Sequence, residues 1–295
     1  MQTAFFDEEP VGAISPAREI TAYEHLWKLH GTVKRMADLF REHEHVLPSE
    51  VADRLGIASE ELTETESKLV SLMSFDKYTA FFFRDFEYPA GLRDAKHPVE
   101  VLYTRGEHSL LSSRSVSIVG TRTPTDIGIK RARKVARILV DAGITVMSGL
   151  ASGIDTAAHQ ATLAEGGATI AVMGTSLAET YPRENLRLRR QIEARHLVVS
   201  PVPFALSASR TWVANRAFFP ERNKTMSALS SATIIVEAGE TSGTLTQAKA
   251  AVQQNRKLLI LGSCFESGLD WPQEFLGKGA VRIGSDSELI DALEL

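Results

Sequence analysis

The sequence predicts an α/β fold, built as a doubly wound, mostly parallel sheet that follows a small helical domain. From Ser115 onward, short apolar runs alternate with segments of helical periodicity, which is the pattern of strand–helix–strand units. Small residues, beginning with Gly120, stand where an apolar run meets the next helix. Residues 20–83, in contrast, show helical spacing interrupted by glycine and proline.

The composition is that of an ordinary globular chain. It has 295 residues, of which 43% are hydrophobic and 24% charged, with a formal net charge of −4. A nucleic-acid-binding protein of this composition would need a local basic patch. The single cysteine, Cys264, excludes an internal disulfide framework. The acidic N-terminus does not resemble a signal peptide and no apolar run is long enough to span a bilayer, so we expect a cytoplasmic protein without membrane association.

The N-terminal part is expected to be a helical domain. Residues 1–18 are rich in proline and glycine for their length and are expected to form a loose arm. Residues 47–73 could form a helix-turn-helix, but the would-be recognition helix carries four glutamates, which phosphate would repel. A small packing domain of short helices is the preferred interpretation. We place the domain boundary near Phe86, giving domains 1–85 and 86–295.

The second domain begins with an extension that contains a strand near 99–103. Apolar runs then predict strands at 115–120, 144–147, 168–173, 198–199, 233–236, 258–261 and 281–283. The helix after Thr125 carries Lys130, Arg133, Lys134 and Arg137 on one face, which we interpret as a solvated face. Residues 200–220 are expected to be a long irregular passage, and a helix from Glu221 to Leu229 follows.

Turns of small and polar residues end four of the predicted strands. They cover residues 120–122, 148–153, 174–176 and 239–244. Because the carboxyl ends of parallel strands share one edge of a sheet, these turns should lie together where folds of this class bind ligands. Backbone N–H groups of small residues and helix N-termini favour anions. The sequence therefore predicts a phosphate-binding mouth at this edge.

Signatures of the common nucleotide enzymes do not accompany these turns. The first strand is not followed by G-x-G-x-x-G, and there is no Walker A motif, which disfavours nicotinamide and ATP ligands. There is also no nucleophile elbow, no cysteine paired with a histidine motif and no cluster with metal-ligand spacing. We expect no catalytic residue, no metal and no cofactor.

The sequence suggests roles for three polar residues near these turns. Arg122 can bind phosphate bidentately, or form a salt bridge with Asp155 or Glu237. Asp155 is placed to cap the next helix, and His159 is expected to be a satisfied core histidine.

The passage from residue 210 to 224 interleaves basic with aromatic residues. This composition suits single-stranded nucleic acid, because cations track the backbone while rings stack on bases. An equally good interpretation is that the aromatic residues pack in the core and the basic residues lie in solvent.

The most specific signal comes from longer segments between about Phe86 and Gly262. They read SIVGTRTPTDIG, VMSGLASGIDTAAHQATLAEGGATIAVMGTSLAETYPREN, FPERNKTMSALS and IIVEAGETSGTLTQAKAAVQQNRKLLILGS, preceded by YPAGL and VLYTRGEHSLL. In order and spacing these segments resemble the DprA/Smf family of DNA-processing proteins.

That resemblance implies an extended Rossmann-like domain that forms a homodimer, binds single-stranded DNA and loads a RecA-type recombinase, as in natural transformation and competence. It implies a binding protein, not an enzyme. Arg122 would contact phosphate, Ser148 and Gly149 would offer hydroxyl and backbone contacts, and Phe219 would lie near the bases. The full implied site is Gly120, Thr121, Arg122, Ser148, Gly149, Gly153, Phe219, Arg222, Asn223, Lys224, Ser242, Gly243 and Thr244.

Departures from the family pattern support an alternative function. Ser152 replaces an arginine of the usual GLARGID turn, Glu221 enters the FPxRNR motif, and the C-terminal winged helix of many members is not expected. A less cationic mouth could hold one small nucleotide, so a nucleotide-signal sensor, as in phage defence, is the alternative.

A third hypothesis is a nucleotide phosphoribohydrolase, because such enzymes of the same superfamily resemble this chain at Gly239–Gln247. Their motif PGGxGTxxE ends in a catalytic glutamate, where this chain has Gln247. An amide cannot supply the charge or accept the proton of a carboxylate, so no such activity is expected.

Overall fold

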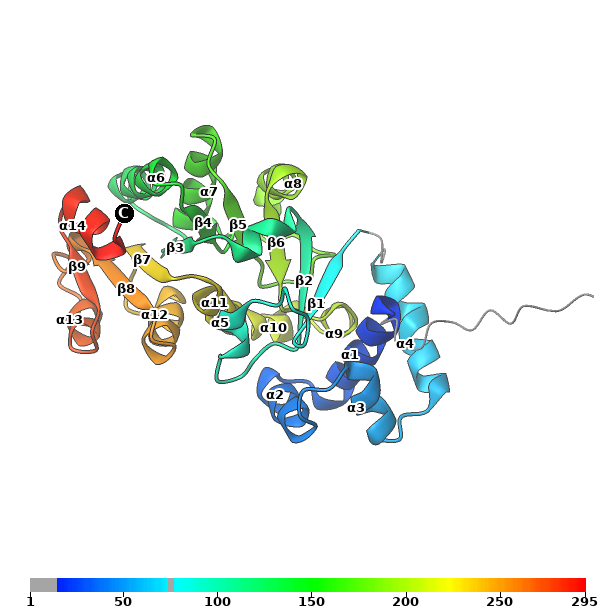
Figure 1. Ribbon diagram of the computed structural model, residues 1–295. Helices are drawn as coiled ribbons and strands as arrows, with labels where there is room; N and C mark the ends of the chain where they lie inside the picture. The colour runs from blue at the N-terminus through cyan, green and yellow to red at the C-terminus, as the bar shows by residue number, and fades with distance from the viewer. Residues whose placement is uncertain (1–14, 74–76) are drawn as a thin grey trace, which may run out of the picture.

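The structure is a computed structural model, and it describes residues 15–73 and 77–295. It contains one nine-stranded sheet with the order β1-β2-β6-β5-β4-β3-β7-β8-β9 (Figure 1). The strands are β1 (Thr79–Phe82), β2 (Val101–Gly106), β3 (Ser115–Gly120), β4 (Thr145–Ser148), β5 (Thr169–Val172), β6 (Leu197–Ser200), β7 (Ala232–Glu237), β8 (Lys257–Leu261) and β9 (Val281–Ile283).

The helices are α1 (Pro16–His30), α2 (Val33–Glu42), α3 (Pro48–Arg54), α4 (Ser59–Leu72), α5 (Ala90–Arg93), α6 (Asp126–Asp141), α7 (Ile154–Ala164), α8 (Leu186–Arg195), α9 (Phe204–Ser209), α10 (Trp212–Asn215), α11 (Phe218–Leu229), α12 (Thr244–Gln253), α13 (Trp271–Leu276) and α14 (Asp286–Leu293).

The sheet is doubly wound, as predicted. β3 to β9 pair in parallel, and only β1 with β2 and β2 with β6 pair antiparallel. From β3 the chain first adds β4, β5 and β6 on one side, and later adds β7, β8 and β9 on the other. The switch point therefore lies between β3 and β7, where folds of this class bind ligands.

Helices cover both faces of the sheet (Figure 1). α6, α7 and α14 pack through one apolar cluster on one face, where Val116, Ala136 and Leu289 are buried. α11, α12 and α13 pack through another cluster, which buries Met226, Ala248 and Phe275. Because both faces are covered, the central strands β3, β4 and β7 are buried along almost their whole length, and the few polar residues in them, such as Ser117 and Thr233, are buried as well.

The N-terminal helices assemble around α1, which packs against α3, α4 and α9 (Figure 1). The buried carboxylate of Glu24 on α1 ties this group to the sheet domain. Its Oε1 accepts hydrogen bonds from the Tyr103 hydroxyl of β2 at 2.7 Å and from Phe204 N at 2.8 Å, and its Oε2 accepts one from Ala205 N at 2.9 Å. Glu24 thereby satisfies the first free N–H groups of α9.

Several boundaries differ from expectation. Residues 79–82 form β1, although 20–83 was expected to be helical, and the sheet therefore begins before Phe86. The division into domains 1–85 and 86–295 stays a prediction. Of the expected loose arm over 1–18, residues 1–14 lie outside the described residues, and α1 already begins at Pro16.

The passage 200–220 is not irregular, because it contains α9, α10 and the start of α11. α9 and α10 have six and four residues. Helices this short show no readable periodicity, and their ends depend on local bonds such as the one from Ala214 N to the Thr211 hydroxyl.

Candidate nucleic-acid interface

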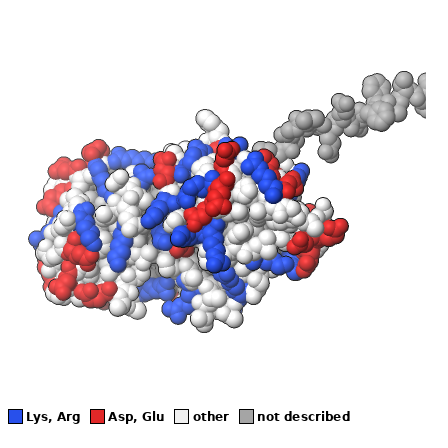
Figure 2. All heavy atoms as spheres, turned by 90° about the horizontal axis from the view of Figure 1, so that it is seen from below, with Lys and Arg blue, Asp and Glu red and all other residues white. Residues whose placement is uncertain are grey.

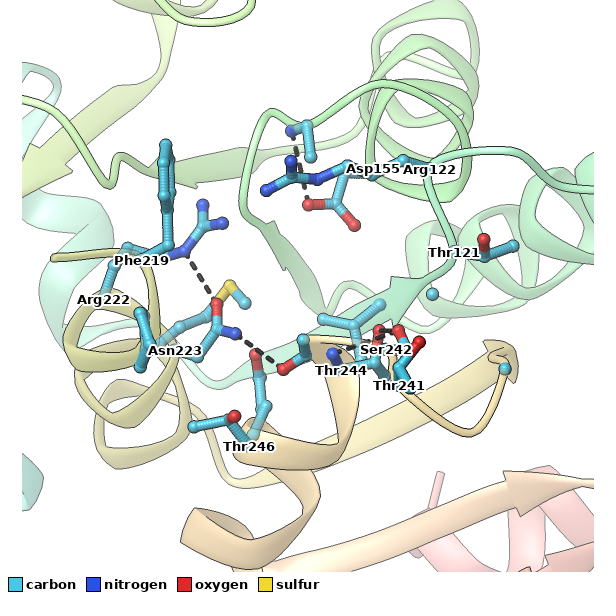
Figure 3. Close-up of a pocket in the computed structure, with 18 of the residues that line it drawn as sticks. Thr121, Arg122, Asp155, Phe219, Arg222, Asn223, Thr241, Ser242, Thr244 and Thr246 are labelled. Carbon is cyan, nitrogen blue, oxygen red and sulfur yellow. Dashed lines mark hydrogen bonds between the residues drawn. The ribbon is translucent and has the colours of Figure 1, made fainter. Parts of the chain in front are cut away.

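A cavity of about 500 Å³ lies at the switch point. Its walls come from the end of β3, the loop between β7 and α12, and one face of α11 (Figure 3). Nine of the thirteen residues expected at the site line this cavity, namely Gly120, Thr121, Arg122, Phe219, Arg222, Asn223, Ser242, Gly243 and Thr244. The lining does not include Ser148, Gly149, Gly153 or Lys224.

Arg122 is exposed at the cavity and lies against an aromatic ring. Its guanidinium carbon is 5.4 Å from the centroid of the Phe219 ring, and Figure 3 shows both side chains at the rim of the cavity. Neither Asp155 nor Glu237 forms the alternative salt bridge, and no ion pair joins Arg122 to any residue that the structure describes. Its hydrogen-bond donors therefore remain available for an anion.

The two neighbouring phenylalanines have different surroundings: Phe218 is a core residue and Phe219 is a residue of the cavity. Phe218 is buried and meets Trp27 of α1 edge to face, with ring centroids 6.0 Å apart. Phe219 lines the cavity and lies directly on Gly174, where a Cβ would collide with the ring. The glycine after β5 thus makes room for an aromatic ring rather than for a phosphate.

Arg222 is buried and organises the floor of the cavity. Its Nη1 donates to the carbonyl oxygens of Gly149 and Val172, and its Nε donates to Asn223 Oδ1 at 2.9 Å. Burial lowers the pKa of Arg222 to about 10, so the guanidinium stays charged at neutral pH. It connects β5, the loop after β4 and α11 while keeping a positive charge beneath the cavity.

Asn223 connects α11 to the loop between β7 and α12. Its Oδ1 accepts from Arg222, and its Nδ2 donates to the Gly243 carbonyl at 2.9 Å (Figure 3). Both ends of the amide are therefore occupied by the protein. Asn223 positions residues 242–244 at the cavity.

The expected anion position at the N-terminus of α6 is filled by the protein itself. Glu237, at the end of β7, accepts from Thr125 N at 3.0 Å and from the Thr125 hydroxyl at 2.8 Å. A Cβ on Gly128 would collide with the same carboxylate. A phosphate held by this helix end, as in dinucleotide enzymes, would have to displace Glu237.

The second turn is likewise closed by a carboxylate. Asp155 Oδ2 accepts from Gly149 N at 3.1 Å and from Ala151 N at 3.3 Å, so it holds the loop before α7 instead of capping that helix. Burial raises the pKa of Asp155, and the nearby Arg222 opposes this shift. The buried Ser148 hydroxyl donates to the Ile118 carbonyl, so Ser148 joins the end of β4 to β3, whereas Gly149 takes part in holding the loop.

Gly153 and Lys224 also have structural surroundings. Gly153 has φ of +83°, and a Cβ there would collide with the backbone of Thr121 and Arg122. Lys224 pairs with Glu221 at 2.8 Å and lines a different cavity, on the other side of α11. Arg210 is also outside the site, because it donates to the Gly31 carbonyl at the end of α1.

The positive character of the cavity therefore comes from three arginines. Arg216, which was not among the expected site residues, lines the cavity and is exposed together with Arg122, above the buried Arg222. Figure 2 shows one face of the molecule, on which Lys and Arg gather toward the middle, and Asp and Glu lie at both ends and also among these basic residues. On the expected solvated face of α6, the exposed Lys134 and Arg137 form ion pairs with Asp286 and Glu165.

Two other residues have core environments. His159 is buried, bonds through Nδ1 to the Thr169 hydroxyl at 2.8 Å, and burial lowers its pKa to about 3. Gln247 lies at the back of the cavity but is buried, with Nε2 donating to the Thr233 hydroxyl at 3.3 Å.

No group of histidine, cysteine or carboxylate side chains in the described ranges has the arrangement of a metal site. Within the same ranges, no helix is long and apolar enough to cross a membrane.

The chain is similar to known proteins in sequence and in fold. DNA processing protein DprA of Bacillus subtilis is 34% identical over 209 residues, which are 70% of this chain and 68% of that protein. Protein Smf of Synechocystis sp. is 40% identical over 181 residues, which are 60% of this chain and 44% of that protein.

Two solved structures are similar over most of their length. DprA of Streptococcus pneumoniae superposes with a TM-score of 0.76 at 27% identity, covering 94% of this chain and 98% of that one. DNA processing protein A of Helicobacter pylori superposes with a TM-score of 0.63 at 28% identity, covering 74% and 95%. Residues 79–294 match the family described as DNA recombination-mediator protein A. With this match, the relatives and the shared Rossmann-like fold, the chain belongs to the DprA/Smf family of DNA recombination-mediator proteins.

Proposed function

We propose that this chain binds single-stranded DNA at the switch-point cavity, with phosphate at Arg122 and Arg216 and a base against Phe219. The observation that carries the proposal is the exposed Arg122 guanidinium held beside the Phe219 ring. A cation next to an aromatic ring matches the alternation of phosphate and base along one strand. The similar Helicobacter pylori protein is described as binding single-stranded DNA.

We also propose that the protein acts as a homodimer, that it presents the bound strand to a RecA-type recombinase in DNA processing such as natural transformation, and that it is not an enzyme. The family description as recombination mediator and the names of the relatives support this role. Light scattering would report the dimer, and a strand-loading assay with the recombinase would report the hand-over.

The surroundings of Ser152 and Glu221 weaken the case for a small-nucleotide sensor. Glu221 pairs with Lys224 outside the cavity, and the Ser152 hydroxyl donates to Glu184 at 2.9 Å. Neither residue lines the cavity between β3 and β7. The cationic residues that do line it keep their charge.

The first experiment is a binding titration with a labelled dT oligonucleotide of a few tens of bases, over a salt series, beside a duplex of equal length. We expect binding that favours the single strand and weakens with salt, because neutralised phosphates release counterions. Absence of binding at low salt would overturn the proposal. A thermal shift with single nucleotides but none with oligonucleotides would favour the sensor instead.

A further inference from the structure

Two large aromatic side chains are exposed next to the cavity. Tyr181 is 38% exposed and Trp212 is 43% exposed, and their ring centroids lie 4.3 Å apart at an interplanar angle of 46°. The Phe219 ring lies 5.6 Å from Tyr181 and 5.9 Å from Trp212. We call the rings of Tyr181, Trp212 and Phe219 the aromatic shelf.

The shelf is assembled from three separate segments. Tyr181 comes from the connection between β5 and α8, Trp212 begins α10, and Phe219 belongs to the first turn of α11. This convergence does not serve only to fill the core, because two of the three residues, Tyr181 and Trp212, remain more than one third exposed. Contiguous exposed aromatic surface of this kind marks a binding site more often than isolated apolar residues do.

The shelf is continuous with the proposed DNA site. Phe219 belongs to both, since its ring lies close to the Arg122 guanidinium and also to the rings of Tyr181 and Trp212. Beyond the shelf a second open cavity of about 830 Å³ is lined by Tyr181, Trp212 and neighbouring polar residues. The binding surface therefore extends past the switch point.

Resting on the proposed function, we propose that Tyr181 and Trp212 stack on the bases that follow the nucleotide at Phe219. The strand leaves the cavity over the shelf, with its bases toward the rings and its phosphates toward solvent. The bases of a duplex are already stacked and paired and cannot reach these rings. The shelf is thus the element that selects single strands, whereas the arginines bind any phosphate backbone.

The charges around the shelf support contact through bases. Glu179 and Glu184 line the second cavity and outnumber its one cation, Arg183. Phosphates lying directly on this surface would be repelled. Stacking, in contrast, needs only a free π-face, and its contribution depends little on salt.

The tryptophans provide a direct test in the intact protein. The chain has three, and Trp27 and Trp271 are 2% and 3% exposed, so Trp212 is the one that a ligand can reach. We would titrate the protein with dT oligonucleotides and follow tryptophan fluorescence together with anisotropy of a labelled strand. We expect quenching that saturates with binding, and none with an abasic oligonucleotide of equal length.

Substitutions test whether the rings of the shelf stack on bases or only support the structure. Trp212→Ala and Tyr181→Ala should each weaken binding by roughly 5- to 100-fold, the range for loss of one stacked base, with an unchanged salt slope. The matched control is Val213→Ala, which removes a 74%-exposed apolar side chain next to Trp212 that belongs to no ring pair and should leave affinity unchanged. Thermal melting checks that each variant is folded.

The outcomes distinguish this inference from the function on which it rests. If anisotropy showed strong binding without quenching of tryptophan fluorescence, and Trp212→Ala bound with wild-type affinity, stacking on the shelf would be ruled out. The proposal of single-stranded DNA binding would remain. No binding by either readout would overturn both proposals. Equal loss of single-strand and duplex affinity in Trp212→Ala would also count against the shelf as the selective element.

Discussion

Neighbouring side chains on α11 face two different cavities, and the helical period explains which residues face which cavity. Phe219, Arg222 and Asn223 are spaced i, i+3 and i+4 and face the switch-point cavity. Glu221 and Lys224 are spaced i and i+3 and face the cavity on the other side of the helix. Treating residues 222–224 as one basic cluster missed this separation, although the helical spacing was present in the sequence.

Arg122→Ala should weaken binding to single strands of every sequence alike, because Arg122 is placed to contact phosphate and not base edges. The slope of log affinity against log salt should become shallower by about 0.7 to 1, as expected for one lost phosphate contact. A salt series by fluorescence anisotropy measures both effects.

The control for Arg122→Ala is Lys224→Ala, which removes another cation that the family resemblance implied for the site but that lies outside the cavity. It should leave the salt slope unchanged. A slope that is shallower in Lys224→Ala than in Arg122→Ala would contradict the placement of phosphate.

Gln247 leads to a prediction about enzymatic activity. It is buried and donates to Thr233, and its amide cannot act as the carboxylate of a phosphoribohydrolase. Incubation with nucleoside monophosphates should release no free base by chromatography. Release that disappears in Gln247→Ala would show that the cavity is catalytic after all.

Among secondary-structure elements, α6 shows how the protein uses its own carboxylates where a ligand could bind. Glu237 accepts two hydrogen bonds from Thr125 at the start of this helix. Thr125 is the N-cap of α6, because its hydroxyl accepts from Gly128 N, and Glu237 holds this cap residue in place. Glu237→Ala should therefore lower the free energy of unfolding by about 1 to 2 kcal/mol, the usual effect of losing hydrogen bonds to a carboxylate. Urea denaturation measures the change.

The matched control is Glu66→Ala, which removes an exposed carboxylate of α4 and should change the free energy of unfolding by less than about 0.5 kcal/mol. If Glu237→Ala were as stable as wild type, the hydrogen bonds from Thr125 to Glu237 would not stabilise the start of α6. Phosphate that stabilises Glu237→Ala but not wild type would support the view that this carboxylate occupies an anion position.

For the whole molecule, Glu24 links the N-terminal helices to the sheet domain and makes stability depend on pH. Burial raises the pKa of Glu24 to about 7 in the folded protein, from about 4.5 when exposed. Between these values the folded state binds more protons than the unfolded state, so raising the pH favours unfolding. The stability contribution is present below pH 4.5 and is lost as the pH rises through 7.

Glu24→Gln removes this titration, so the difference in unfolding free energy between wild type and variant should fall by on the order of 3 kcal/mol from pH 4.5 to pH 7. Denaturant unfolding at several pH values measures it. Using a difference cancels the opposing effect of buried histidines such as His159, whose pKa burial lowers. A pH-independent difference would contradict a buried, titrating Glu24.

Alternating apolar runs and helical periods predicted the doubly wound sheet, and seven strands from β3 to β9 lie within about two residues of expectation. This worked because buried parallel strands need continuous apolar segments, a property of each segment alone. β1 was missed because four residues next to a helical domain carry too short a pattern to distinguish.

The location of the site followed from the order of strands and small turns along the chain. The hydrogen-bond partners at the site could not be predicted in this way, because packing between segments far apart in the sequence determines which groups meet. Glu237 accepts from Thr125 at the start of α6 and Asp155 accepts from the turn before α7, so two of the expected anion positions already have protein partners, whereas Arg122 in the first turn remains open. Similarly, Tyr181, Trp212 and Phe219 are separated in the sequence, and they meet only because the fold brings the connection after β5 and the starts of α10 and α11 together.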